Sequence, residues 1–292
     1  MLSTMASFYR LILKVKKLKD NSTAQTSVKW FRELNLQRPV RLLAGNCKIT
    51  HELIADTPVY TLQPPGRDSG KTVLFLHGGG FVGGPHLFHW HLAGKIARAA
   101  QCRVVVPIYP LAPEHPYPAA VNALFELYGQ LASRYGAPPV LMGDSAGGNL
   151  ALVTALKLKN EKLPLPPKLV LLSPCLDQQL NNPEIDALEQ QDAMLNRKAA
   201  QTVHAVYIGN TSITNPYISP IFGNLENLPP VLLLCGTKEI FYPDCLLFTQ
   251  MVRQQGGSIE LLEGNGLFHD WPMFPLLPEA ADAIAGIAKF LA

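Results

Sequence analysis

The 292-residue sequence has few cysteines, few charged side chains and no long apolar run, and each shortage excludes a class of protein. Its five cysteines are scattered without a C-x-x-C pair, so we expect neither a metal site nor a disulfide framework. Free cysteines fit a reducing compartment, which predicts a cytoplasmic protein. No stretch approaches roughly 18 uninterrupted apolar residues, so we expect no membrane-spanning helix. The N-terminal segment also lacks the apolar core of a signal peptide.

The remaining composition is that of an ordered globular protein. Hydrophobic residues make up 48% of the chain and charged residues 16%, and the net charge of +3 is too small to suggest a nucleic-acid partner. The charge is uneven, because residues 1–41 hold nine Lys/Arg and two acidic residues. Residues 5–20 space their apolar side chains as in a helix with a basic opposite face. Such a helix either covers its own protein, which we expect, or lies on a membrane surface without inserting stably.

From residue 47 onwards, short apolar segments alternate with segments of helical pattern. Strands are predicted at 47–53, 58–62, 73–76, 102–107, 140–142, 169–172, 231–234 and 258–262, and helices at 87–100, 119–135, 149–158, 244–254 and 279–291. Several of these strands are unbroken apolar runs, as in a mainly parallel sheet with helices on both faces. The first two strands are candidates for an antiparallel edge. The sequence therefore predicts an α/β protein.

A serine lies between one predicted strand and the following helix. Gly143-Asp144-Ser145-Ala146-Gly147 has the form G-x-S-x-G, which in a strand–turn–helix context exposes the serine as a nucleophile. The two flanking glycines are needed because the turn is too tight for a Cβ on either side. The motif alone is common by chance, and a glycine-rich helix entry is the other interpretation.

A second glycine turn follows the strand at 73–76. Acyl transfer through a serine creates an oxyanion that needs preorganised amide donors, and Gly78-Gly79-Gly80 allows the backbone to supply them. Gly78, Gly80 and Gly83 also match the pattern G-x-G-x-x-G, which is typical of dinucleotide-binding sites. However, Pro85 interrupts the helix which that pattern requires, and residues 96–108 hold no Asp or Glu. We therefore favour an oxyanion loop.

A nucleophilic serine needs a histidine base. In α/β hydrolases the chain order is serine, acid, histidine. After Ser145 only His204 and His269 remain. His204 lies in a helical pattern and is expected at the surface or at a cap. His269 lies in the loop after the strand at 258–262, at the sheet edge where α/β active sites form, and is the predicted base.

The acid is predicted in the loop after the strand at 231–234. Glu239 is preferred because Asp244 resembles the N-cap of the next helix, although Asp244 stays as the second candidate. Asp270 adjoins the base, but neighbours in a loop rarely face each other well. We expect Asp270 to be a loop-stabilising or exposed carboxylate.

Several motifs together resemble one known family. They are His77-Gly78-Gly79-Gly80, the proline-rich loop 109–120, Gly143-Asp144-Ser145-Ala146-Gly147-Gly148, Leu172-Ser173-Pro174 with Asp177, the segment 215–220 with 228–230, and Phe268-His269 with Trp271-Pro272. Over roughly residues 45–292 the chain resembles the hormone-sensitive-lipase-like esterases of the α/β-hydrolase superfamily. The resemblance implies an eight-stranded, mostly parallel sheet in a catalytic domain at 46–292. It also implies a helical cap formed by N-terminal helices at 1–45 and an insertion at about 178–215.

The resemblance assigns roles to individual positions. Ser145 matches the nucleophile and His269 the base, and the amides of Gly79, Gly80 and Ala146 match the oxyanion hole.

Other positions match supporting roles or depart from the family pattern. His77 is expected to steady the glycine loop, while Asp144 and Glu114 match residues that hold the elbow and the proline loop. Two positions differ: Glu239 stands where most members have aspartate, and Pro110 replaces a usual arginine, which puts any ion pair from that position in doubt.

These expectations describe a serine carboxylesterase for small-molecule esters, and the resemblance implies short acyl chains. The predicted chemistry needs no metal or organic cofactor. An amidase or arylformamidase would use the same three residues and stays open. A non-catalytic ligand receptor on the same fold and a membrane-surface lipase also stay open, as does assembly into a homodimer.

Overall fold

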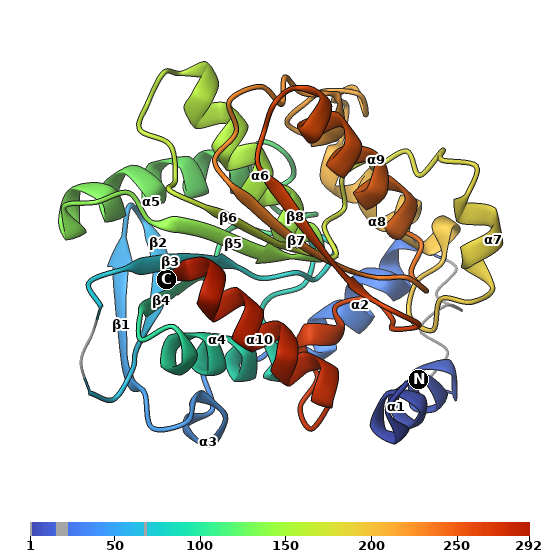
Figure 1. The fold of residues 1–292 in the computed structure, drawn as a ribbon. Coiled ribbons are helices and arrows are strands. Elements are labelled where there is room, and N and C mark those ends of the chain that lie inside the picture. The colour runs from blue at the N-terminus through green and yellow to red at the C-terminus, as the bar shows by residue number, and fades with distance from the viewer. Residues whose placement is uncertain (1, 16–22, 67–68) are drawn as a thin grey trace.

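The computed structural model describes residues 2–15, 23–66 and 69–292 (Figure 1). Its centre is an eight-stranded sheet with the strand order β1-β2-β4-β3-β5-β6-β7-β8. The strands are β1 (Lys48–Ile54), β2 (Thr57–Gln63), β3 (Thr72–Leu76), β4 (Arg103–Pro107), β5 (Val140–Asp144), β6 (Leu169–Leu172), β7 (Val231–Gly236) and β8 (Ile259–Gly264). β2 pairs antiparallel with β1 and β4, and the pairs from β4 to β8 are parallel. The predicted α/β fold and its antiparallel edge are confirmed.

The central strands are buried at every residue. β3, β5, β6 and β7 have no exposed position, because helices cover both faces of the sheet and remove the usual alternation. The parallel register aligns strand ends: Leu76 pairs with Gly143, and Gly236 pairs with Gly264. The loops after β3, β5, β7 and β8 therefore emerge at one edge of the sheet, where α/β proteins bind their ligands.

The large helices form one layer on each face of the sheet (Figure 1). They are α4 (Leu87–Ala99), α5 (Ala119–Tyr135), α6 (Ser145–Asn160), α9 (Tyr242–Gln254) and α10 (Pro278–Leu291). Apolar side chains of α5, α6 and α9 share one core cluster, and those of α4 and α10 share another. The sheet separates these two clusters and lies between two packed layers of helices.

The first helix packs against its own protein. In α1 (Thr4–Val15), Ala6 and Leu13 are buried, and the Tyr9 ring lies edge-on to Phe274 with centroids 5.0 Å apart. Ser3 Oγ donates to a carboxylate oxygen of Glu279 in α10 at 2.8 Å. The predicted covering role is thus observed in the described part of residues 5–20, whereas residues 16–22 lie outside the described residues. No described helix is both long and apolar enough to span a membrane.

Two further segments pack near the edge of the sheet where the loops after β3, β5, β7 and β8 emerge. α2 (Ala24–Glu33) begins at the capping residue Thr23 and packs against α8 (Arg197–Ile208). The insertion that carries α8 also holds α7 (Ile185–Glu189), and the short α3 (Arg41–Ala44) leads into β1. α2 and α8 fit the expected cap, whereas α1 lies against α10. The division at residue 45 stays a prediction.

Two sequence expectations are wrong. Asp244 is not the N-cap of α9, because the helix begins at Tyr242 with Pro243 in its first turn, a position that suits the fixed φ of proline. His204 is not exposed: it lies on the inner face of α8, buried within hydrogen-bonding range of Cys175 Sγ and of the backbone oxygen of Gln178.

Candidate active site

The turn that carries Ser145, the predicted nucleophile, lies where β5 ends and α6 begins. Ser145 has a left-handed φ of 51°, a strained conformation for a residue with a side chain. A Cβ on Gly143 would lie 2.2 Å from the Gly147 oxygen, and one on Gly147 would lie 2.0 Å from the Leu76 oxygen. Both glycines are therefore required, and the strand–turn–helix context predicted for Ser145 is present.

The glycine loop after β3 faces this elbow. Gly79 and Gly80 have φ values of 117° and 61°, and Gly83 N donates to Gly79 O at 2.8 Å, which closes the loop on itself. Among the described residues, no acceptor takes a hydrogen bond from the amides of Gly79 and Gly80. Ala146 lies in the first turn of α6, where amides have no intrahelical acceptor and the helix dipole is positive. These three amides are available for an anion.

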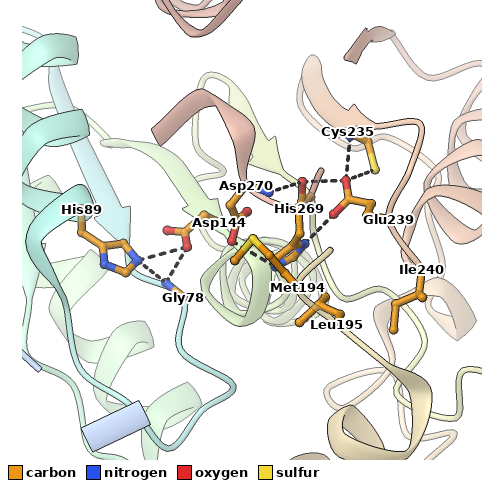
Figure 2. Close-up of polar contacts among 12 residues, drawn as sticks. Gly78, His89, Asp144, Met194, Leu195, Cys235, Glu239, Ile240, His269 and Asp270 are labelled. Carbon is orange, nitrogen blue, oxygen red and sulfur yellow. Dashed lines mark hydrogen bonds and ion pairs between the residues drawn. The ribbon is translucent and has the colours of Figure 1, made fainter. Parts of the chain in front are cut away.

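A buried carboxylate ties the loop to the elbow. Asp144 Oδ2 accepts from Gly78 N at 3.0 Å and lies 3.1 Å from His89 Nε2 (Figure 2). His86 N donates to His89 Nδ1 at 2.9 Å, and His89 Nε2 also lies 3.1 Å from Gly78 N, so the ring sits between the glycine loop and Asp144. Burial lowers the pKa of His89 to about 3, which keeps this imidazole neutral. Asp144 thus occupies the network position expected for it.

His77 also contacts the glycine loop. Its Nδ1 lies 2.8 Å from Gly78 O, and its ring stacks on Tyr109 with centroids 4.2 Å apart. The Tyr109 hydroxyl donates to His77 O at 2.5 Å. Burial lowers the pKa of His77 well below its ordinary value, so the ring is neutral and Nδ1 is the donor. This geometry suits the steadying role expected for His77.

The predicted acid and base meet across the loops after β7 and β8. His269 Nδ1 lies 2.5 Å from Glu239 Oε2 (Figure 2). Glu239 is fully buried, and its Oε1 accepts from Gly236 N at 2.7 Å and from Cys235 Sγ and Ser173 Oγ at 2.8 Å each. Three donors offset the cost of burying a carboxylate. The extra methylene of Glu239 relative to aspartate leaves the contact with Nδ1 intact.

The second candidate acid has different partners. Asp244 Oδ1 accepts from Asn182 Nδ2 at 3.0 Å, and burial raises the pKa of Asp244 to about 6. None of the contacts described for Asp244 reaches His269, so of the two carboxylates weighed from the sequence only Glu239 touches the base.

Asp270 does not match its expectation. It is buried, not exposed, and its Oδ2 lies 3.0 Å from His269 Nε2. The reason is its left-handed backbone, with φ 55°, which turns the carboxylate towards the neighbouring ring. Burial opposes a charge on His269, but Asp270 and Glu239 outweigh it and raise the pKa of His269 well above its ordinary value.

Sequence reasoning missed two supporting residues. Ser173 Oγ accepts from Asp270 N at 3.1 Å while it donates to Glu239. Its position directly after β6, at the same sheet edge, was an available signal. Asp192 binds the amides of Met194 and Leu195 through Oδ1 and that of Ile240 through Oδ2, all within 2.9 Å. It ties the insertion to the acid loop, and nothing in its sequence context indicates this.

The expected cap lies directly on the glycine loop. A Cβ on Gly80 would be 2.8 Å from Val203 Cγ1 of α8 and 3.5 Å from the Phe31 ring of α2. Beside them Phe81 stacks on Tyr207 with centroids 4.0 Å apart. Apolar side chains from α2 and α8 therefore narrow the space above the glycine loop.

An arginine of α2 holds the loops that follow β3 and β4. Arg32 donates to Val82 O at 3.3 Å and to Ala112 O at 3.1 Å, and pairs with the carboxylate of Glu114. The hydrogen bond from Arg32 lowers the pKa of Glu114 to about 2. Pro110 stands where the family pattern has an arginine, and in this structure the cation that pairs with Glu114 comes from α2.

Within the described ranges, no group of three or more His, Cys, Asp or Glu side chains could hold a metal ion.

Comparison with known proteins identifies the family. The sequence profile of a family described as having the alpha/beta hydrolase fold matches residues 73–273. The chain belongs to this family. An esterase of Acinetobacter venetianus is 35% identical to this α/β hydrolase over 224 residues, which cover 75% of the chain and 74% of the relative. An acetyl-hydrolase of Streptomyces hygroscopicus is 32% identical over 231 residues, covering 78% and 77%.

Solved structures agree with this assignment. The fold matches an esterase from the bacterial hormone-sensitive lipase family with a TM-score of 0.86 at 28% identity, over 100% of this chain and 98% of that one. An esterase/lipase from an uncultured bacterium matches with a TM-score of 0.90 at 28% identity, over 99% and 98%. The resemblance to hormone-sensitive-lipase-like esterases, seen first in the motifs, is confirmed.

Proposed function

We propose that this α/β hydrolase cleaves short-chain carboxylic esters through an acyl-enzyme formed on Ser145. The activity class follows from the family and from relatives named esterase, acetyl-hydrolase and carboxylesterase, so the chain is a carboxylic-ester hydrolase. The observation that carries the mechanism is the 2.5 Å contact between His269 Nδ1 and Glu239 Oε2, at the sheet edge that also bears the elbow. A cytoplasmic location stays a prediction.

Each residue has one chemical task in this mechanism. Ser145 Oγ attacks the acyl carbon while His269 Nε2 takes its proton, and Glu239 fixes the tautomer of the ring and stabilises its cation. The carbonyl oxygen becomes an oxyanion, which the amides of Gly79, Gly80 and Ala146 would bind.

The remaining steps reuse the same base. The alcohol leaves with the proton from His269 Nε2, and the acyl group stays on Ser145. Water then loses a proton to Nε2 and attacks the acyl carbon. The bond between that carbon and Ser145 Oγ breaks, Nε2 returns the proton to Oγ, and the carboxylic acid is released. No step requires a metal ion or an organic cofactor.

Two observations support a preference for short acyl chains. Phe31 and Val203 crowd the space above Gly80, so a long acyl chain bound at the oxyanion loop would meet the cap. Relatives from Streptomyces hygroscopicus and Pseudomonas putida are named acetyl-hydrolase and ethyl acetate hydrolase.

The test is a series of p-nitrophenyl esters from acetate to decanoate, together with an anilide and an N-formyl substrate. We expect kcat/KM to be highest at acetate or butyrate and to fall with chain length. In Ser145→Ala, kcat should fall by at least about 10⁴-fold, because the nucleophile is absent. Ester turnover retained in that variant would refute the mechanism, and faster cleavage of the anilide would point to an amidase.

A further inference from the structure

His269 contacts a carboxylate through each of its ring nitrogens. Glu239 Oε2 lies 2.5 Å from Nδ1, and Asp270 Oδ2 lies 3.0 Å from Nε2 (Figure 2). Nε2 is the nitrogen that must take the proton of Ser145. In the part of the chain that the structure describes, no hydrogen bond joins Ser145 Oγ to His269. Nε2 therefore lies within ion-pair distance of Asp270 and makes no hydrogen bond with Ser145 among the described residues.

Hydrogen bonds through Ser173 fix the position of Asp270. Its amide donates to Ser173 Oγ, and the same hydroxyl donates to Glu239 Oε1, so one serine fixes the backbone beside one carboxylate and an oxygen of the other. The second carboxylate oxygen of Asp270, Oδ1, is buried and has no hydrogen-bond partner among the described residues. The carboxylate of Asp270 thus supports no other part of the loop, and its polar contact is with His269.

We propose that Asp270 is a positioning residue that holds the Nε2–H of His269 in the resting enzyme, and that Ser145 gains its base only when this ion pair opens. The proposal rests on the proposed function of Ser145 and His269. On opening, the Nε2–H bond breaks and its proton passes to solvent water. The lone pair left on Nε2 can then accept the proton of Ser145 Oγ–H.

The charges around the ring set the expected pH dependence. Besides Asp270, the titratable groups that face His269 from other segments are Glu239, Asp144, Asp192 and Cys245. Burial raises the pKa of Asp270 to about 7, and the neighbouring Asp144 adds to the shift. The proton between His269 and Asp270 nevertheless lies on the imidazole ring of His269. Glu239 is a second carboxylate beside this ring and stabilises its protonated form.

The sign of the effect follows from that cation. A base with a raised pKa is protonated and inactive at low pH, and activity appears only as the pH rises through this pKa. Removing the charge of Asp270 leaves one carboxylate on the ring and lowers the pKa of His269. Activity should then extend to lower pH.

The experiment compares pH profiles of kcat/KM for p-nitrophenyl acetate in wild type and Asp270→Asn. Asparagine tolerates the left-handed φ of 55° and keeps the size of the side chain. We expect the acid limb to move down by about one pH unit or more, the usual effect of removing a contacting opposite charge. Asp244→Asn is the matched control: it neutralises a buried aspartate without contact to His269 and should leave the limb unchanged.

A second variant and a second measurement keep the role of Asp270 testable if Asp270→Asn does not fold. Asp270→Gly also fits the left-handed backbone, and it should move the acid limb in the same direction if Asp270→Asn fails to fold. The NMR resonance of the Nδ1 proton of His269 reports its titration directly and should shift its midpoint downwards in the folded variant.

The outcomes separate the two claims. The role of Asp270 would be overturned if, in the variants, the acid limb of the kcat/KM profile and the midpoint of the His269 titration stayed at their wild-type positions. A loss of activity that is equal at every pH would also overturn it. Absence of ester hydrolysis in the wild type would contradict the proposed function instead, and the NMR titration would still decide whether Asp270 holds Nε2.

Discussion

The two sides of Ser145 are built by different means. On the oxyanion side, glycines and the first turn of α6 aim backbone amides, and a single carboxylate, Asp144, ties the loop to the elbow. On the base side, hydrogen bonds between side chains link the ends of β6, β7 and β8, with Ser173, Glu239 and His269 as the central members.

The two sides also differ in charge. His77 and His89 on the oxyanion side are neutral, because burial lowers the pKa of both. His269 on the base side is held as a cation between Glu239 and Asp270. We therefore expect changes of pH and of charge to act mainly through the base side, whereas changes in the cap should alter the acyl chains accepted above the glycine loop.

The largest effect is expected from breaking the base side. Glu239→Gln removes the charge that fixes the His269 tautomer, so kcat should fall by about 10³–10⁴-fold, as in triads that lose their acid. Asp244→Asn should stay within about threefold of wild type, because Asp244 does not contact the base. Steady-state hydrolysis of p-nitrophenyl butyrate measures both. An equal loss in the two variants would contradict the assignment of the acid.

A smaller effect is expected from opening the cap over the oxyanion side. Val203→Ala removes the methyl groups next to Gly80, so the ratio of kcat/KM for octanoate to that for acetate should rise roughly tenfold. Val206→Ala, one turn further along α8, is the control and should leave this ratio unchanged. If Val203→Ala leaves the ratio unchanged too, then α8 does not limit the acyl chain.

The smallest effect is expected at the exposed rim of the cap. Arg32→Gln weakens bonds to Val82 O and Ala112 O at a partly exposed site, which should cost about 1 kcal/mol, or roughly fivefold in kcat/KM. Arg134→Gln removes a comparable surface pair with Glu52 and should have no effect on kcat/KM.

Glu114, the partner of Arg32, sets the pH range of this prediction. Its depressed pKa of about 2 means that any stability it adds is present above its ordinary pKa and is lost as the pH falls through about 2. The loss of kcat/KM in Arg32→Gln should therefore be the same at every pH between about 5 and 9. A defect confined to one end of this range would show that the arginine acts through the base side.

The features predicted correctly from the sequence are those encoded locally. The strand before Ser145, the tight turn that needs Gly143 and Gly147, and the alternation of apolar runs with helical segments are all properties of neighbouring residues. The eight-stranded, mostly parallel sheet and the pairing of Glu239 with the loop of His269 follow from the family pattern and from the common edge of parallel strands.

The features that were missed depend on contacts between distant segments. His204 is buried because α8 packs on the core, and Arg32 meets Glu114 because α2 folds over the proline loop. Asp270 was expected to face away from its neighbour, but a left-handed φ reverses its direction. A backbone angle at a single non-glycine residue leaves no periodic signal in the sequence.

The central claim is that Ser145 is the acylated nucleophile, and covalent labelling tests it most directly. A fluorophosphonate should modify the wild type once per chain, and peptide mass spectrometry should place the adduct on Ser145. Ser145→Ala should take up no label, and Glu239→Gln should label far more slowly. Stoichiometric labelling at another residue, or unchanged labelling of Ser145→Ala, would contradict the account.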